Sequence, residues 1–164
     1  MQEFNRDISI AVIQQFIDNG ASCDNTKNQN INENSGVRIL EALSATGLRS
    51  IRYAKEIKGV KEIVANDISK RAVASIERNI NANKVSDLVT ASHSDATMIM
   101  YNNRQKENRF DVVDLDPYGS PTPFLDGAVQ SVAEGGLLCV TATDLAVLGI
   151  KDTIIICHLP EYML

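Results

Sequence analysis

The sequence lacks the patterns that mark membrane, disulfide-rich and metal-binding proteins. It has no tryptophan, and aromatic residues make up 5% of its 164 positions. No apolar run approaches the roughly 20 residues of a membrane-spanning helix, and the polar start has no signal-peptide pattern. Its three cysteines, Cys23, Cys139 and Cys157, are widely spaced, and its two histidines have no partner at ligand spacing. We therefore expect an intracellular protein with neither a disulfide framework nor a metal site.

Positive charge is also scarce. The chain carries 16 lysines and arginines against 21 aspartates and glutamates, which gives a net charge of −5 and a pI of about 5.0. Proteins that grip a nucleic-acid backbone usually present a basic surface. The one evident basic cluster spans residues 49–61, and a solvated helix face explains it as well as phosphate binding does. A nucleic-acid partner would need most of its affinity from elsewhere.

Short apolar segments alternate with amphipathic ones along the chain. Strands are predicted at residues 37–43, 60–67, 88–96, 110–115 and 137–144. Helices are predicted at residues 4–18, 48–57, 69–83, 96–104 and 121–134, the last one stopped by Gly135 and Gly136. A chain of this length is one domain by the usual prior, and the alternation predicts an α/β fold: a mostly parallel sheet with helices on both faces.

Helix caps and one polar segment complete this outline. Asn5 or Asp7 is the expected cap of the first helix, and Ser69 that of the third. Residues 19–36 are almost wholly polar and rich in asparagine, which predicts a flexible surface insertion.

The turn after the first predicted strand is S-A-T-G, residues 44–47. Small residues such as Ala45 and Gly47 let the backbone approach a ligand, and the following helix offers free N–H groups. The dinucleotide fingerprint G-x-G-x-x-G is absent, because Gly47 is the one glycine in this turn. The turn fits a nucleotide-like ligand but disfavours a nicotinamide- or flavin-dependent oxidoreductase.

Acidic residues close the second and third predicted strands. Asp67 lies 20 residues beyond Gly47, where an acidic strand end meets ribose hydroxyls in nucleotide-binding folds, and Ile68 follows it. The third strand ends at Asp95 and Ala96. Right-handed crossovers bring these strand ends, and that of the fourth strand, to one edge of the sheet.

The fourth predicted strand opens the stretch F-D-V-V-D-L-D-P-Y-G-S-P, residues 110–121. Asp114 lies inside the strand, and Asp116, Pro117 and Tyr118 follow at the mouth of the expected crevice. A carboxylate accepts hydrogen bonds from a planar amine, an aromatic ring stacks on a planar base, and proline fixes the turn. This stretch predicts chemistry on a flat nitrogen heterocycle; taken alone, a plain surface turn is the alternative.

Several segments, taken in order, resemble a known family: E-A-L-S-A-T-G-L-R-S-I-R, A-N-D-I-S, D-L-D-P-Y-G-S-P-T-P-F-L-D and V-T-A-T-D. They are similar to the tRNA (guanine-26) N2-methyl/dimethyltransferases, which are class I S-adenosylmethionine-dependent enzymes. The leading F-N-R-D segment resembles the same family, and the likeness covers residues 2–148 apart from the Asn-rich insertion. The resemblance implies a Rossmann-like class I methyltransferase that methylates the exocyclic N2 of a guanine in tRNA.

The resemblance also implies a cofactor site for S-adenosylmethionine. Asp67 would bind the ribose, and Asp95 with Ala96 the adenine end, whereas Arg6 and Arg49 would contact the cofactor directly. The remaining expected contacts lie in the first turn and after the second strand, at Ala45, Gly47 and Ile68.

For catalysis, the resemblance implies Asp116 as the catalytic carboxylate, within a catalytic segment that includes Asp114 and Pro117. Tyr118 would stack on the flipped guanine. The amine lone pair of guanine is delocalised into the ring, so a carboxylate that accepts its N–H localises the pair and takes the proton as the methyl group moves.

The resemblance further implies how the chain is organised. Residues 1–148 are expected to form the methyltransferase domain and residues 149–164 a divergent tail, without the family's C-terminal domain. The tail's T-I-I-I-C run either adds a strand or forms an exposed edge. We expect weak binding of tRNA and neither DNA nor membrane binding; nucleus, cytoplasm and mitochondrion are not distinguished. The alternatives are a non-catalytic cofactor-binding fragment and a methyltransferase acting on another planar amine.

Overall fold

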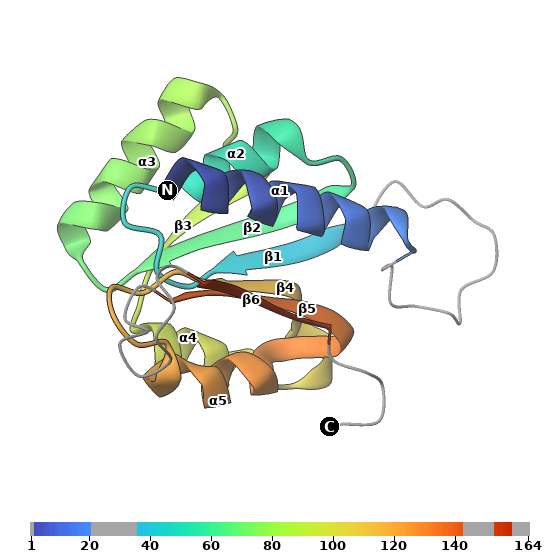
Figure 1. The fold of residues 1–164 in the computed structure, drawn as a ribbon. Coiled ribbons are helices and arrows are strands. Elements are labelled where there is room, and N and C mark those ends of the chain that lie inside the picture. The colour runs from blue at the N-terminus through green and yellow to red at the C-terminus, as the bar shows by residue number, and fades with distance from the viewer. Residues whose placement is uncertain (1, 21–35, 143–152, 159–164) are drawn as a thin grey trace.

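The computed structural model describes residues 2–20, 36–142 and 153–158, and these form three layers, with a β-sheet between two layers of helices (Figure 1). Within the described residues the sheet has six strands, in the order β3-β2-β1-β4-β5-β6. Their bounds are β1 Val37–Glu41, β2 Val60–Asp67, β3 Val89–His93, β4 Phe110–Leu115, β5 Val132–Ala142 and β6 Thr153–His158. The first five are parallel and β6 is antiparallel to β5, which confirms the predicted mostly parallel sheet.

Helices cover both faces of this sheet, as the alternation predicts. On one face lie α1 Gln2–Asp18, α2 Leu48–Glu56 and α3 Lys70–Asn83, and on the other lie α4 Ala96–Asn102 and α5 Thr122–Ser131 (Figure 1). A short 3-10 turn, Lys106–Asn108, precedes β4. Ser69 caps α3 as predicted, because its Oγ accepts the N–H of Ala72 at 3.5 Å.

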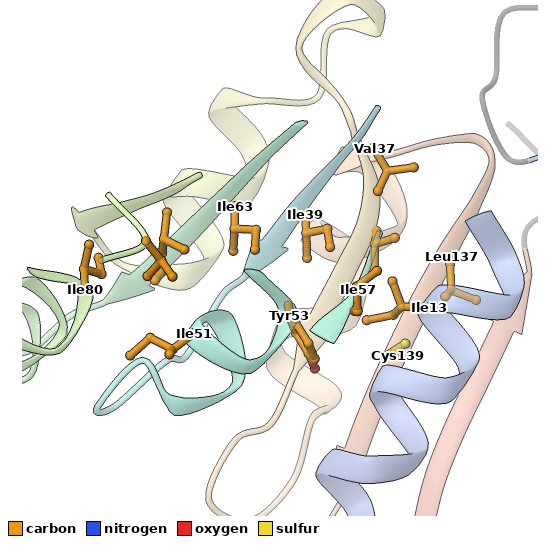
Figure 2. Close-up of a cluster of buried hydrophobic side chains, with 14 of the residues drawn as sticks. Ile13, Val37, Ile39, Ile51, Tyr53, Ile57, Ile63, Ile80, Leu137 and Cys139 are labelled. Atoms are coloured by element: carbon orange, nitrogen blue, oxygen red, sulfur yellow. The ribbon is translucent and has the colours of Figure 1, made fainter. Parts of the chain in front are cut away.

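Two apolar cores follow from this layering. The first lies between the sheet and α1–α3; it includes Ile13, Ile39, Tyr53 and Ile63, each fully buried (Figure 2). The second lies under α4 and α5 and is built on Met100, Phe110, Val113, Leu115 and Ala128. Apolar side chains on both faces of the central strands explain why those strands read as unbroken apolar runs.

The first helix starts earlier than the sequence predicts. Helix α1 begins at Gln2, so Asn5 and Asp7 lie inside the helix and the prediction that either caps it is wrong. Asn5 is buried, and its carbonyl oxygen accepts the hydroxyl of Ser9 at 3.1 Å. The packing of Ile13 and Phe16 against the sheet holds the helix in place without that cap.

The boundary between α5 and β5 also differs from the prediction. Helix α5 ends at Ser131 rather than at residue 134, and β5 already begins at Val132. Gly135 and Gly136 lie inside this strand, beside a register shift against β4, instead of stopping a helix. Gly135 has φ 71°, and a Cβ at Gly136 would come within 2.8 Å of the Ala133 carbonyl oxygen. The two glycines therefore allow the backbone of β5 to adopt an irregular conformation at this register shift.

The T-I-I-I-C run forms most of β6, so one of the two alternatives for it, an added strand, is confirmed. Residues 21–35, most of the predicted insertion, lie outside the described residues, as do 143–152 and 159–164 of the predicted domain end and tail.

Candidate functional site

The carboxyl ends of the parallel strands meet at one edge of the sheet, and hydrogen bonds tie them together. Ser44 N–H donates to the carbonyl of Asn66 at 2.8 Å, and Ala42 N–H donates to that of Asp114 at 3.1 Å. The Asn66 amide donates to the carbonyls of Ala42 and Ser94, both at 3.0 Å. The ends of β1, β2, β3 and β4 thus form one continuous rim, where candidate side chains converge.

The turn after β1 forms the first part of this rim. Gly47 has φ 74° and Ala45 has φ 50°, both in the left-handed region that favours glycine. A Cβ at Gly47 would lie 3.2 Å from Ile76, so this turn packs tightly on α3. Ala45 and Thr46 are exposed, and α2 begins directly after the turn. The predicted small-residue turn therefore places two exposed residues beside a helix N-terminus.

Asp67, at the end of β2, bonds to this turn. Its Oδ2 accepts the N–H of Ala45 at 2.9 Å, and its Oδ1 accepts the N–H of Ser69 at 2.8 Å. The neighbouring Ile68 is 65% exposed. The carbonyl of Ile68 lies 3.0 Å from Nε2 of His93, at the end of β3. Asp67 and Ile68 thus lie side by side with the turn, as the sequence predicts for one site.

Asp95 caps the next helix. Its Oδ1 accepts the N–H groups of Thr97 at 2.8 Å and Met98 at 3.1 Å, at the start of α4. Ala96, the first residue of α4, is buried at 4% exposure. This capping role was not predicted, although an aspartate directly before a helix is the usual signal for it.

Arg49, on α2, is a buried cation at the centre of the rim. It is 5% exposed, and both its Nε and its Nη2 lie 3.0 Å from Oδ2 of Asp116. Its Nη1 donates to Ser9 Oγ at 3.0 Å, and its Nη2 donates to Thr141 Oγ1 at 3.3 Å. Burial opposes the charge, yet the neighbouring Asp114, Tyr53 and Asp116 raise the pKa of Arg49 above its ordinary value. The guanidinium is therefore directed at the end of β4.

Asp114 and Tyr53 lie behind Arg49, away from solvent. Tyr53 OH donates to Asp114 Oδ2 at 2.5 Å, and the same oxygen lies 3.6 Å from Arg49 Nη1. Both side chains are fully buried. Burial raises the pKa of Asp114, and Arg49 and Tyr53 oppose that rise. Burial also raises the pKa of Tyr53 well above its usual value. Asp114, expected in the catalytic segment, is thus an interior residue rather than a surface one.

Glu41 is a second buried carboxyl at this rim and was not among the predicted site residues. Its Oε2 accepts the N–H of Ser50 at 3.0 Å and also the Ser50 hydroxyl. Burial, followed by the charge of Asp114, raises the pKa of Glu41 from 4.5 to about 8. The signal was present, because Glu41 ends an apolar strand just as Asp67 does.

The D-P-Y-G segment that follows β4 reaches the surface. The Asp116 side chain is 33% exposed, and only its Oδ2 is engaged by Arg49. No donor among the described residues bonds Oδ1 of Asp116. Pro117 is buried, whereas Tyr118 is 97% exposed and Gly119 has φ 86°. The segment thus presents one carboxylate oxygen and one aromatic ring to an incoming molecule.

Arg6 lies on α1, which borders this rim. It is half-buried and three residues before Ser9, so both side chains face the same side of the helix. Because Ser9 contacts Arg49, Arg6 lies on the helix face turned toward the site. The described residues give the Arg6 guanidinium no hydrogen bond of its own.

The described residues contain no group of three or more His, Cys, Asp or Glu side chains arranged to hold a metal ion. They also contain no helix with the length and apolar character needed to span a bilayer.

Comparison with known proteins gives consistent matches. The family profile described as N2,N2-dimethylguanosine tRNA methyltransferase matches residues 1–157. The tRNA (guanine(26)-N(2))-dimethyltransferase of Drosophila melanogaster is 67% identical over 114 residues, which cover 70% of this chain and 20% of that protein. The Homo sapiens protein of the same name is 43% identical over 190 residues, covering 91% of this chain and 29% of that protein. The chain thus spans less than a third of these two curated relatives.

Among solved structures, Trm1 from Pyrococcus horikoshii, in complex with S-adenosyl-L-methionine, superposes with a TM-score of 0.69 at 32% identity. The superposition covers 90% of this chain and 38% of that one.

Proposed function

Because the chain belongs to the N2,N2-dimethylguanosine tRNA methyltransferase family, we propose that it binds S-adenosylmethionine and directs a methyl group to N2 of guanine 26 in a tRNA. The family membership agrees with the resemblance seen in the sequence motifs. One observation carries the proposal further: Asp116 has one carboxylate oxygen fixed by Arg49 at 3.0 Å, and its other oxygen accepts no hydrogen bond from the described residues, on a side chain that is 33% exposed at the rim.

The turn at residues 44–47 and the end of β2 fit the nucleoside part of the cofactor. Each Asp67 oxygen accepts one backbone N–H, from Ala45 or Ser69, which leaves further lone pairs for ribose hydroxyls. The exposed Ile68 offers an apolar surface for the adenine ring. Ala45 and Thr46 are exposed next to the N-terminus of α2, where the ligand has room to approach. When bound, the cofactor supplies a methyl group that its sulfonium has already activated.

Asp95, Ala96 and Arg6 complete the proposed cofactor site. The second Asp95 oxygen and the backbone N–H of Ala96 are the proposed contacts for the adenine edge, while Oδ1 of Asp95 caps α4. Arg6, on the site-facing side of α1, is available for the carboxylate end of the cofactor. Arg49 is kept as a proposed cofactor contact, as the resemblance implies, and its buried guanidinium is at the same time bonded to Asp116.

Asp116 is the proposed group that accepts the guanine amine. Its open Oδ1 can accept a hydrogen bond from the exocyclic N–H, which localises the nitrogen lone pair, and can take the proton when the carbon–nitrogen bond forms. Buried Pro117 restricts the backbone next to Asp116, and Arg49 holds one oxygen of its carboxylate. The chain's main contribution is thus orientation of donor and acceptor.

Tyr118 is the proposed stacking platform for the flipped base. Its ring is 97% exposed and lies two residues after Asp116, so a base that stacks on it can place its amine near the carboxylate. Stacking offsets part of the cost of taking the guanine out of its helix.

Weak binding of tRNA is part of the proposal. In the basic cluster at residues 49–61, Arg49 is buried against aspartates, Arg52 pairs with Asp7 and Glu56 at 2.7 Å, and Lys55 donates to Asn83. Few free cations remain there to meet phosphates, and the net charge is −5. We therefore expect affinity for tRNA to be low and to fall steeply with salt, with no preference for DNA.

Two measurements test this function. Calorimetric titration with S-adenosylmethionine is expected to show binding to the wild type and weaker binding to Asp67→Ala, while the exposed control Asp87→Ala retains it. Methyl transfer is then measured with a tRNA transcript carrying guanine at position 26 and with a matched transcript carrying adenine there. Two results together support the proposal. Wild type transfers a methyl group to the guanine transcript, and Asp116→Ala abolishes this transfer while its cofactor affinity is nearly unchanged. Cofactor binding without transfer assigns the chain to the non-catalytic alternative, and equal transfer to both transcripts contradicts guanine 26 as the target that the chain selects.

A further inference from the structure

We propose that Tyr53 and Asp114 are positioning residues for methyl transfer, which act on Asp116 by fixing the guanidinium of Arg49. The inference rests on the proposed function, because it takes Asp116 as the acceptor of the guanine amine. Neither residue faces the ligand: both are fully buried behind Arg49. Their effect on the reaction is therefore indirect and runs through one cation.

The contacts form a continuous series of hydrogen bonds from the core to the surface. Tyr53 OH donates to Asp114 Oδ2 at 2.5 Å and accepts from Arg49 Nη1 at 3.5 Å. Arg49 in turn holds Asp116 Oδ2 at 3.0 Å. Solvent exposure rises along this series, from fully buried Tyr53 and Asp114 through nearly buried Arg49 to partly exposed Asp116. The last member alone meets an incoming molecule.

Arg49 has little freedom to leave this arrangement. Ser9 on α1 accepts from Nη1 at 3.0 Å, and Thr141 on β5 accepts from Nη2 at 3.3 Å. Together with Tyr53 on α2 and the aspartates of the β4 segment, these contacts reach the guanidinium from several directions. Because a guanidinium is planar and its donors have fixed directions, such contacts determine its orientation as well as its position.

The charges explain why the tyrosine hydroxyl matters. Asp114 Oδ1 has no hydrogen-bond partner among the described residues, so its Oδ2 receives the donors available to it, Tyr53 and more distantly Arg49 at 3.6 Å. A buried carboxylate that loses one donor attracts the remaining cation more strongly. Without the hydroxyl, Arg49 is drawn toward Asp114 and away from Asp116.

An alternative is that this network serves stability alone. A buried ion pair contributes little to stability compared with apolar residues of the same volume, so stability is a weak reason to have one. A structural role and a positioning role predict different results for the same variants. If the role is structural, the variants lower stability without a selective effect on the chemical step. If the role is positioning, they lower the rate of methyl transfer while cofactor affinity remains.

Tyr53→Phe is the decisive variant, because it removes one hydroxyl and keeps the ring that packs in the core (Figure 2). Tyr101→Phe is its matched control: Tyr101 OH also donates to an aspartate, Asp126, but between α4 and α5. We expect Tyr53→Phe to lower kcat for methyl transfer by roughly a hundred-fold, as small misplacements of a catalytic group do. The cofactor Kd and the KM for tRNA are expected to stay within about two-fold of wild type, since no ligand contact is removed. Tyr101→Phe is expected to leave all three unchanged.

The outcomes separate this inference from the proposed function. If wild type transfers no methyl group, the proposed function fails for this chain. If wild type transfers and Tyr53→Phe keeps its full kcat, or loses cofactor affinity in proportion, the positioning role is refuted while the function stands.

A second measurement does not depend on turnover. In 15N-labelled protein, the Arg49 Nε proton, held against Asp116, is expected to exchange slowly with solvent. Tyr53→Phe and Thr141→Val, which each remove one contact near this guanidinium, are expected to speed that exchange by roughly ten-fold or more, the effect of losing a hydrogen bond to a charged group. Unchanged exchange in Tyr53→Phe overturns the inference even if the chain has no activity.

Discussion

Glu41 makes the stability of this fold depend on pH in a way that can be worked out from its surroundings. Its side chain is 2% exposed, and burial, followed by the charge of Asp114, raises its pKa from 4.5 to about 8. The donors on Ser50 act in the opposite direction but do not offset the burial. Glu41→Gln removes the titration while keeping the size of the side chain and an oxygen that can accept from Ser50.

The direction in which stability changes with pH follows from the number of protons bound by the folded and unfolded states. The unfolded chain releases the Glu41 proton near pH 4.5, whereas the folded chain keeps it until about pH 8, so between these values the folded state binds one more proton. Wild type therefore loses about 1.4 kcal/mol of stability per pH unit across this window relative to Glu41→Gln. The difference reaches on the order of 5 kcal/mol at the top of the window and is constant above it.

Denaturant unfolding of wild type and Glu41→Gln at closely spaced pH values from 4 to 9 measures this difference. Glu56→Gln is the control, because Arg52 lowers the pKa of exposed Glu56, so its contribution is present above its unfolded pKa and is lost as pH falls. Its pH dependence is small, of opposite sign and confined to the acid side. A difference between wild type and Glu41→Gln that stays flat from pH 5 to pH 8, or grows toward low pH, refutes the reasoning about Glu41.

Three further predictions concern packing and backbone geometry, each measured by denaturant unfolding. Gly136→Ala is expected to cost about 2–3 kcal/mol, because its Cβ would meet the backbone oxygens of Ala133 and Asp111 at 2.8 and 2.9 Å; a cost near zero contradicts the described irregularity of β5. Gly47→Ala is expected to cost about 1–2 kcal/mol for its left-handed φ of 74°, and to weaken cofactor binding as well, since it shifts the turn; stability and affinity unchanged would show that the turn tolerates a side chain. Ile13→Ala, in the fully buried part of α1, is expected to cost about 2–5 kcal/mol, and a loss below 1 would mean that α1 is loosely docked.

The sheet and the rim were predictable because their signals are local. Apolar runs that end in an acidic or small residue predicted the strands, and the right-handed crossover rule predicted that Asp67 and Asp116 lie at the same edge of the sheet. The limits of α5 were not predictable: Val132 fits a helix pattern and a strand pattern equally well, and Gly-Gly is compatible with either a helix end or a β-irregularity.

The buried network of Arg49, Tyr53 and Asp114 could not be predicted from the sequence, for a different reason. Arg49 lies in a run of basic residues that resembles a solvated helix face, and Tyr53 one turn later looks like an ordinary core aromatic. Their function depends on partners 61 to 92 positions away in the chain. The usable signal was Asp114: a carboxylate in the middle of an apolar strand requires a buried cation or donor nearby.

The reach of the Arg49 contacts has a consequence for folding. Ser9 precedes Arg49 by 40 positions, and Thr141 follows it by 92, so the guanidinium joins the beginning of the described chain to its fifth strand. Contacts of such sequence separation form late, because long loops must close first. A chain still emerging from the ribosome can pair β1 with β2 while Arg49 lacks its later partners. The geometry that aims Asp116 is therefore completed only once β5 has joined the sheet.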